Sequence, residues 1–209
     1  RLTGTVGRYT LGALAVRQAE SAGLAARDLV VARGYAGVGE QATVGGIFTW
    51  GDPTSERRNY PGGLDVVVRN QELIPNPAIE AKAWAQRSRT EGFEGRDGAW
   101  GLSLAYPNDR IDALFSYTNI EERFRPALGF VNRTGIQEFL SQGTYRYRFA
   151  DAGWLRSVRA GGSWKETGDQ DNPLESRAIT LTPFILDSTT GAASTRASAS
   201  PGGRPGICT

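Results

Sequence analysis

The chain lacks several residue types on which common active sites depend. It has no histidine, and its single cysteine, Cys208, lies close to the end of the sequence. One cysteine cannot form an internal disulfide, and without histidine neither the usual zinc site nor a histidine-dependent triad can be assembled. We therefore expect no enzyme activity, no metal and no cofactor, and we interpret Cys208 as an incidental residue.

Two further absences concern the chain as a whole. It contains no methionine, and no positively charged segment precedes an apolar run as in a signal peptide. We therefore expect this sequence to be an internal part of a longer protein. No stretch approaches the roughly 20 consecutive apolar residues of a transmembrane helix, so any membrane-spanning structure has to consist of strands.

The composition combines balanced charge with few aliphatic residues and much glycine. There are 24 basic and 22 acidic residues, a net charge of +2, and no basic cluster. Because binding to nucleic acid requires a concentrated basic surface, we expect no such partner. The hydrophobic fraction is only 39%, whereas glycine occurs 27 times and aromatic residues reach 10%. These values are typical of strands with one apolar face that are joined by many turns.

Apolar and polar residues alternate with a period of two along most of the chain, which is the pattern of half-buried β-strands. The clearest example is a pair of segments separated by residues 107–110. Each segment has an apolar face, formed by Trp100, Leu102, Leu104 and Tyr106 in the first and by Ile111, Ala113, Phe115 and Tyr117 in the second. Proline and asparagine in the intervening segment suit the backbone angles of a turn. We predict a β-hairpin here.

The same pattern predicts about 11 antiparallel strands in an up-and-down meander. They lie near residues 1–6, 9–18, 28–35, 42–50, 63–70, 78–88, 98–106, 111–120, 135–149, 154–165 and 176–186. Several match the length of tilted membrane-spanning strands, about 9–11 residues, and exceed the usual soluble strand of about five or six. The predicted fold class is all-β, a partial outer-membrane β-barrel over residues 1–186.

The end of the chain differs from the rest. Residues 187–209 are rich in serine, threonine, glycine and proline and show no alternation, so we expect a disordered or truncated tail. The odd number of strands, and the lack of a terminal aromatic residue, indicate that the barrel is incomplete. The chain by itself should therefore form an open, curled sheet with unpaired edges.

The lengths of the predicted connections alternate. Short connections at 7–8, 36–41, 107–110 and 150–153 are interleaved with long ones at 19–27, 51–62, 89–97, 121–134 and 166–175; the segment 71–77 is intermediate. Outer-membrane barrels have short periplasmic turns and longer extracellular loops, which produces this alternation. A soluble sandwich with Greek-key crossings has no reason to show it.

Two sets of side chains are candidates for function. The predicted polar faces carry the candidate lumen-facing residues Asp65, Arg69, Glu80, Lys82, Asp112, Glu138, Arg146, Arg148, Arg159 and Lys165. They could bind or pass polar solutes such as sugars, or they could merely pair across neighbouring strands. Aromatic residues near both strand ends suggest two girdles at the lipid–water boundary: Tyr9, Trp50, Trp100, Tyr106, Tyr117, Trp154 and Trp164, with Tyr35 and Phe149 in the same pattern.

Several stretches resemble a known bacterial family. They are Leu2-Thr-Gly-Thr-Val-Gly-Arg-Tyr-Thr-Leu-Gly, Val44-Gly-Gly-Ile-Phe-Thr, Gly153-Trp-Leu-Arg-Ser-Val-Arg159 and, most specific of all, Phe124-Arg-Pro-Ala-Leu-Gly-Phe-Val-Asn-Arg-Thr-Gly135. The chain is similar over residues 1–186 to domain of unknown function 5916, the C-terminal β-barrel region that follows a family 9-like carbohydrate-binding module. The resemblance implies an outer-membrane location and a link to carbohydrate handling through that N-terminal module. It supplies no catalytic residues.

Four short motifs suggest other chemistry, but each is better explained by an ordinary structural role or by coincidence. The glycines of Gly34-Tyr-Ala-Gly-Val-Gly39 do not have nucleotide-loop spacing and favour a turn. The segment 169–173 offers oxygens for calcium but lacks the features of an EF-hand loop. Adjacent carboxylates at Glu121 and Glu122 point apart, unlike a glycosidase pair. The sequence Asn132-Arg-Thr134 matches a glycosylation acceptor, which we interpret as coincidental.

These observations favour a segment of a bacterial outer-membrane β-barrel that acts as a pore or membrane anchor and is associated with carbohydrate binding or uptake. Its expected partners are outer-membrane lipid and, through a missing module, carbohydrate. One alternative is a soluble, secreted carbohydrate-binding protein in which Trp50, Trp84, Trp100 and Trp164 line a sugar platform or the core. Another is part of a glycoside hydrolase, which would require two carboxylates about 5–10 Å apart.

Overall fold

The computed structural model describes residues 1–20, 24–70, 79–150, 153–170, 174–188 and 192–199. In this part the chain is all β. Its strands are β1 (Leu2–Val6), β2 (Tyr9–Gln18), β3 (Arg27–Val38), β4 (Ala42–Trp50), β5 (Asn59–Asn70), β6 (Ile79–Thr90), β7 (Gly98–Pro107), β8 (Ile111–Ile120), β9 (Ile136–Arg148), β10 (Leu155–Asp169), β11 (Ser176–Ser188) and β12 (Ala192–Ala199). The described residues include no helix long and apolar enough to cross a membrane.

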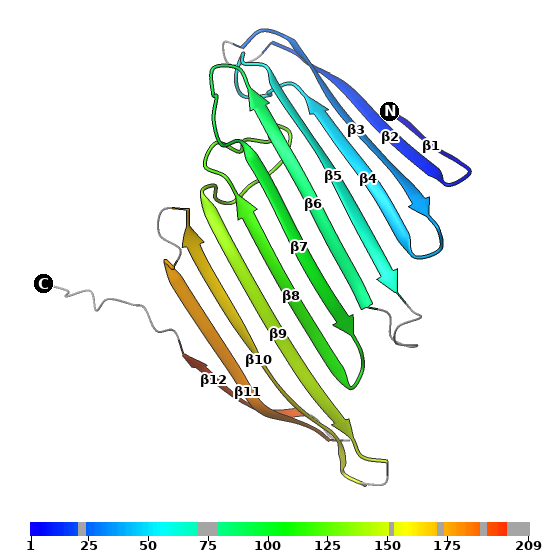
Figure 1. Cartoon of the computed structure of the whole chain (residues 1–209), viewed down its shortest axis with the longest axis vertical. Helices are drawn as coiled ribbons and strands as arrows, with labels where there is room; N and C mark the ends of the chain where they lie inside the picture. The colour runs from blue at the N-terminus through cyan, green and yellow to red at the C-terminus, as the bar shows by residue number, and fades with distance from the viewer. Residues whose placement is uncertain (21–23, 71–78, 151–152, 171–173, 189–191, 200–209) are drawn as a thin grey trace, which may run out of the picture. The chain divides into compact units, whose positions relative to one another are not determined.

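The strands form one sheet in which spatial order follows sequence order from β1 to β12 (Figure 1). Neighbouring strands pair antiparallel, as in β2 with β3, β3 with β4 and β10 with β11. In this order β1 and β12 each have one neighbour, so the sheet formed by the described strands is open. The predicted all-β, up-and-down meander is therefore confirmed, and so is the prediction of an unclosed sheet.

Two hairpin turns depend on glycine. Gly7, between β1 and β2, has φ 59°, and Gly39, between β3 and β4, has φ 63°. Backbone angles with positive φ are unfavourable for residues with a Cβ, so a glycine at each turn allows the chain to reverse at once. The register beside each turn is unbroken, from Val6 opposite Tyr9 to Leu2 opposite Ala13 in the first hairpin and from Val38 opposite Ala42 to Val30 opposite Trp50 in the second.

Strand β5 begins at Asn59 and not near residue 63, where the sequence analysis placed its start. The sequence analysis placed Pro61 and Gly62 in the connection 51–62, yet the structure includes both in the strand. The regular β4–β5 register ends at Phe48 opposite Gly62, because Pro61 has no N–H to donate to the ladder. Pairing then resumes with a hydrogen bond from Gly51 N to Asn59 O at 3.1 Å.

The region beyond residue 186 also differs from the sequence expectation. Strand β11 continues to Ser188, and Ala192–Ala199 form a twelfth strand that pairs antiparallel with β11. The prediction of a strandless tail is therefore wrong for residues 192–199. The free edge of β11 offers backbone groups that any extended segment can pair with. Residues 200–209, including Cys208, lie outside the described part of the chain.

The connections fall into two sets because successive antiparallel strands run in opposite directions. At the turn end of the strands are residues 7–8, 39–41, 108–110 and 149–154; at the loop end are residues 19–26, 51–58, 91–97, 121–135 and 170–175. The predicted alternation of short and long connections holds from β1 to β5 and from β6 to β9. It fails after β9, because β10 continues to Asp169 and shortens the loop that follows it. The predicted intermediate connection at 71–77 lies outside the described residues.

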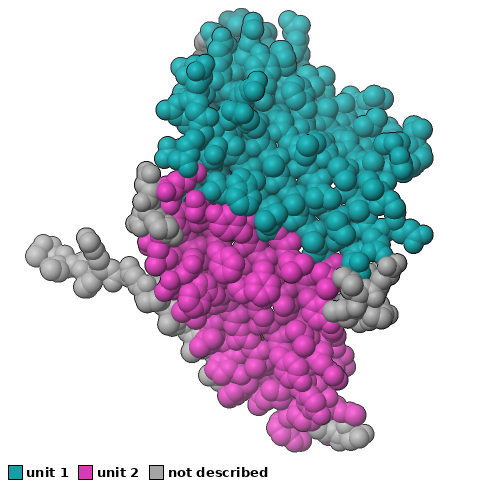
Figure 2. Space-filling model, in the orientation of Figure 1, with its two compact units in different colours: residues 1–70, 80–102, 118–136 teal, residues 71–79, 103–117, 137–209 magenta. Residues whose placement is uncertain are grey.

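The chain divides into two compact units (Figure 2). Unit 1 comprises residues 1–70, 80–102 and 118–136, and unit 2 comprises residues 71–79, 103–117 and 137–209. In both, we use "apolar face" and "polar face" for the two sides of the strands, which are defined by the residues given for each unit.

In unit 1 the register collects apolar side chains on one face. Leu11 lies opposite Gly34, Gly34 opposite Gly46, and Gly46 opposite Leu64. Because alternate residues share a face, this side of β2–β5 carries residues 9, 11, 13 and 15; 30, 32, 34, 36 and 38; 42, 44, 46, 48 and 50; and 60, 62, 64, 66 and 68, none of which is charged. The same alternation adds one charged pair at the loop end, Arg17 on β2 opposite Asp28 on β3. Leu11 and Leu64 are 63% and 69% exposed. This face is therefore apolar and uncovered.

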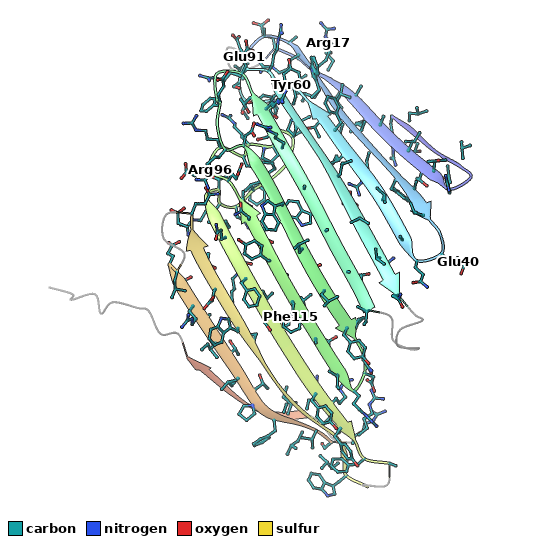
Figure 3. All side chains as sticks on the ribbon, in the orientation of Figure 1. Arg17, Glu40, Tyr60, Glu91, Arg96 and Phe115 are labelled. Carbon is teal, nitrogen blue, oxygen red and sulfur yellow. The ribbon has the colours of Figure 1, made fainter. Side chains whose placement is uncertain are left out.

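In unit 2 the two faces are fixed by contacts between strands. The ammonium group of Lys165 lies 2.7 Å from the carboxylate of Glu138, which places both on the polar face. On the other face, Leu181 lies against Gly162, where an added Cβ would be 3.2 Å from its side chain. Phe115, near the middle of β8, and Tyr145 on β9 are both about half exposed (Figure 3). Here too the apolar face is uncovered.

The described part of the chain has almost no conventional core. Among its buried residues, Ala99 and Phe124 are the hydrophobic ones and Pro61 is also buried, whereas buried polar residues include Asp52, Asn59 and Ser88. A soluble sheet protein packs its apolar face against a second layer. All the described strands belong to a single sheet, so within this part of the chain no second sheet is present to cover the apolar face.

Candidate functional site

On the polar face of unit 1, an ion pair spans a strand. Arg33 on β3 and Asp65 on β5 lie 2.7 Å apart, although β4 runs between their strands. Gly45 on β4 makes this possible, since a Cβ there would lie 2.9 Å from both the guanidinium and the carboxylate. The sequence analysis predicted that Asp65 faces the polar side but did not identify its partner.

A second group of charges lies on the same face near the turn end of β5 and β6. The carboxylate of Glu80 accepts a hydrogen bond from Arg69 at 2.6 Å, and the ammonium group of Lys82 lies 2.6 Å from its other oxygen. Arg69 and Lys82 are about half exposed or more. Pairs of this kind contribute about 0–1 kcal/mol each to stability, so their main effect is to neutralise charge.

The polar face of unit 2 shows the same arrangement. Arg159 pairs with Asp187 at 3.0 Å, and Lys165 pairs with Glu138. Arg146 and Arg148 both reach the carboxylate of Asp109 in the β7–β8 turn, at 2.7 and 2.6 Å. Asp112 lines a shallow hollow on this face together with Gln142, Thr144 and Arg159. Nine of the ten predicted polar-face residues thus take part in ion pairs, which favours charge pairing over a free charged binding surface.

The predicted girdle residues lie at the strand ends, mostly on the apolar face. Tyr9 and Trp154 are exposed near the turn end, and Trp50 and Trp100 are exposed near the loop end. The ring of Trp50 meets that of Tyr60 edge-on, with centroids 4.7 Å apart. The other predicted members follow the same alternation: Tyr106 at the turn end, and Tyr117 and Trp164 at the loop end.

Tyr35 is an exception, and its place in the girdle is corrected. It lies opposite Gly45 and Thr10, and Gly45 belongs to the polar face beneath the Arg33–Asp65 pair. Because Gly34 and Ala36 occupy the apolar face of β3, alternation directs Tyr35 to the other side. The sequence analysis placed Tyr35 in the girdle because it lies near a strand end. The alternation of faces along the strand would have shown that it points to the polar side.

At the loop end of unit 1, Asp52 organises the β4–β5 loop. Its side chain is buried and accepts hydrogen bonds from the hydroxyl groups of Thr54 at 2.7 Å and Ser55 at 2.6 Å, and from both of their backbone N–H groups. The guanidinium of Arg27 donates to the backbone carbonyl oxygens of Asp52 and Ser55. This network ties the loop to the start of β3.

The pKa of Asp52 lies below its ordinary value of 3.8. Burial works to raise this pKa, but the hydrogen bonds from Ser55 and Thr54, together with the charge of Arg125, outweigh it. Because the folded state favours the charged form of Asp52, this carboxylate contributes fully to stability at neutral pH. The contribution is lost only as the pH falls below 3.8, the ordinary pKa, and through the lower pKa of the folded state. We expect a ¹³C carboxyl titration of Asp52 in the full-length protein to have its midpoint below 3.8.

The variant Asp52→Asn tests the same network at neutral pH. An amide offers one acceptor oxygen and no charge, so the Ser55 hydroxyl and the Arg125 guanidinium, which both donate to Oδ2 of Asp52, lose their acceptor. We expect faster tryptic cleavage after the exposed residues Arg57 and Arg58 of this loop. Glu56→Gln, which changes an exposed acid in the same loop, is the matched control. Equal cleavage rates for the two variants would contradict the prediction.

The β8–β9 loop (residues 121–135) folds back onto the strands, and Figure 1 shows it reaching across the loop ends of β6 and β7. The amide of Asn59, which is fully buried, donates to Arg125 O at 2.8 Å and accepts from Ala127 N at 3.1 Å. The hydroxyl of Ser88, also buried, accepts from Arg125 N at 2.7 Å. Phe124 is buried beside these bonds.

Sequence reasoning did not identify these anchoring residues. Asn59 lay inside a predicted loop, and Ser88 stood at the end of a predicted strand with no distinguishing motif. The loop segment 124–135 did attract notice through its resemblance to a known family, but no signal linked it to Asn59 or Ser88. Such a link requires knowledge of which strands are neighbours.

The short motifs discounted above have structural roles. Gly34 lies within β3, and Gly39 forms the turn that follows. The carboxylate of Glu121 accepts a hydrogen bond from Gly98 N at 2.6 Å, which holds it at the strand end, and Glu122 is exposed. Residues 171–173 of the calcium-like segment lie outside the described part of the chain. Within that part, no group of three or more histidine, cysteine or acidic residues is placed to hold a metal.

Comparison with known proteins gives no match. No family model, no curated protein and no solved structure is significantly similar to this chain. The resemblance to domain of unknown function 5916 therefore stays a prediction, and any functional argument depends on the geometry alone.

Proposed function

We propose that this chain is a segment of a bacterial outer-membrane β-barrel that acts as a pore or membrane anchor associated with carbohydrate binding or uptake. The observation that carries the proposal is the contrast between the apolar face and the polar face of the sheet. The apolar face is uncovered along both units, whereas the polar face pairs its own charges. Lipid is the natural cover for such an apolar face, because large exposed apolar surfaces are not stable in water.

Strand length and backbone pairing support the proposal. Strands β2 to β11 run from the nine residues of β4 to the fifteen of β10, enough for tilted strands to span a bilayer. In lipid every backbone N–H and C=O group needs a partner, which strands achieve only in a closed barrel. The open edges of β1 and β12 would therefore be closed by further strands of the full-length protein or by each other.

The alternative of a soluble carbohydrate-binding protein fits the geometry less well. A sugar platform needs aromatic rings on one surface, but in unit 1 Trp84 lies on the polar face, against Gly101, whereas Trp50 and Trp100 lie on the apolar face. A glycoside hydrolase would need two opposed carboxylates, and the adjacent pair Glu121 and Glu122 does not supply them. The proposed link to carbohydrate depends on the family resemblance and on the polar face, which would line the lumen of a closed barrel.

The proposal is tested by heat modifiability. The full-length protein is expressed, extracted from outer membranes with detergent and run on a gel with and without boiling. A closed barrel resists the detergent and migrates differently before boiling, so we expect two band positions. A single position, together with recovery of the protein in the soluble fraction, would rule the proposal out.

A further inference from the structure

The β8–β9 loop docks on the polar face and not on the apolar one. Ser88 alternates with Gln86 along β6, and Gln86 packs over Gly63, where an added Cβ would lie 2.5 Å from its side chain. Gly63 in turn alternates with Asp65, which belongs to the polar face. Asn59 is on this face by the same alternation along β5. Both anchors of the loop are therefore polar-face residues.

The docking is specific and not a loose contact. Three hydrogen bonds join Asn59 and Ser88 to the backbone of Arg125 and Ala127, and all lie between 2.7 and 3.1 Å. The Asn59 amide also donates to the hydroxyl of Thr90 at 2.7 Å, which fixes its orientation. Buried side chains that bind loop backbone in this way hold the loop in one position, since losing a partner leaves a buried polar group unsatisfied.

Beyond the anchors, the loop exposes its tip. Gly129 N donates to Pro126 O at 2.8 Å and closes a tight turn, and the next residue, Phe130, is 87% exposed. Among the described residues of unit 1, no side chain packs over this ring. A tip that is held by the polar face and exposes an aromatic ring is suited to contact polar solutes with apolar patches, such as the C–H faces of sugar rings.

We propose that residues 121–135 are a constriction segment, which folds into the lumen of the barrel and restricts the size of the sugar-like solutes that pass. This inference rests on the proposed function, because the polar face encloses a lumen only if the barrel closes. Asn59 and Ser88 act as positioning residues for the segment, and Phe130 lies on the solute path. Pore width and lining then set the conductance and the selectivity of the channel.

The first test releases the segment with the double variant Asn59→Ala/Ser88→Ala in the full-length protein. Loss of three buried hydrogen bonds should raise the undocked fraction of the loop roughly 100-fold, and single-channel conductance in planar bilayers should rise about twofold or more. Thr43→Ala, which removes a hydroxyl from the same face of β4, is the matched control. An unchanged conductance in a heat-modifiable barrel would overturn the inference while leaving the proposed function intact. If the wild-type protein forms no barrel, the proposed function itself fails.

A second test does not depend on the stability of the double variant. Phe130→Cys is prepared in a Cys208→Ser background and treated with a bulky cationic thiosulfonate, and complete modification is verified by mass. We expect the current to fall on modification. The control is Glu40→Cys in the exposed β3–β4 turn, at the other end of the strands from Glu91 (Figure 3), where modification should leave the current unchanged. A fully modified Phe130→Cys channel with unaltered current would also overturn the inference.

Discussion

Phe115→Arg is expected to destabilise the assembled protein by about 2–4 kcal/mol, the penalty for an arginine on the lipid face near the bilayer midplane. Phe115 lies near the middle of β8, on the apolar face, and is 49% exposed. If water covered this face, the same substitution would replace a water-exposed aromatic ring with a charged side chain and change the stability by no more than about 0.5 kcal/mol. The two settings therefore predict effects of clearly different size.

The measurement is equilibrium unfolding of the full-length protein in lipid vesicles with guanidinium. Ser116→Arg is the matched control, because the neighbouring residue on β8 points to the opposite, polar face, where arginine is already common. We expect the control to unfold close to the wild-type midpoint and Phe115→Arg well below it. Equal midpoints for the two variants would mean that the apolar face does not meet lipid.

The strands could be predicted because their signal is local. Alternation of Trp100, Leu102 and Leu104 with small or polar residues defines both the strand and its faces, and the structure places the β7–β8 turn within one residue of the prediction. The meander order follows from short connections, since a turn such as Pro107–Arg110 leaves the next strand no other neighbour. The misassigned start of β5 shows the limit, because Pro61 signals a loop unless the neighbouring ladder is known.

The loop cluster could not be predicted because its signal is not local. Asn59 and Arg125 are 66 residues apart in sequence, and a hydrogen bond from a side chain to a backbone carbonyl leaves no periodic pattern. The partners of Asp65 were hidden for the same reason: its pair with Arg33 crosses β4 and depends on Gly45 having no side chain. Sequence reasoning therefore identified which face a residue occupies, but not which distant residue it contacts.

Gly161→Ala is expected to destabilise unit 2 by about 1–3 kcal/mol, the usual range for overpacking a tight contact. An added Cβ at Gly161 would lie 2.6 Å from the backbone oxygen of Gly143 and 3.1 Å from Thr144 Cα. Backbone atoms cannot rotate away as a flexible side chain can, so β9 and β10 would have to separate.

Gly143→Ala is the control, because the nearest atom to its added Cβ is Asp112 O at 4.0 Å, an ordinary contact. Both variants replace a glycine in a neighbouring strand with the same residue, so they share the backbone entropy effect, and only the steric clash differs. Guanidinium unfolding of the full-length protein should separate them, with Gly161→Ala less stable. This comparison tests the pairing of β9 with β10 whether lipid or protein covers the apolar face, since the clash lies within the sheet itself.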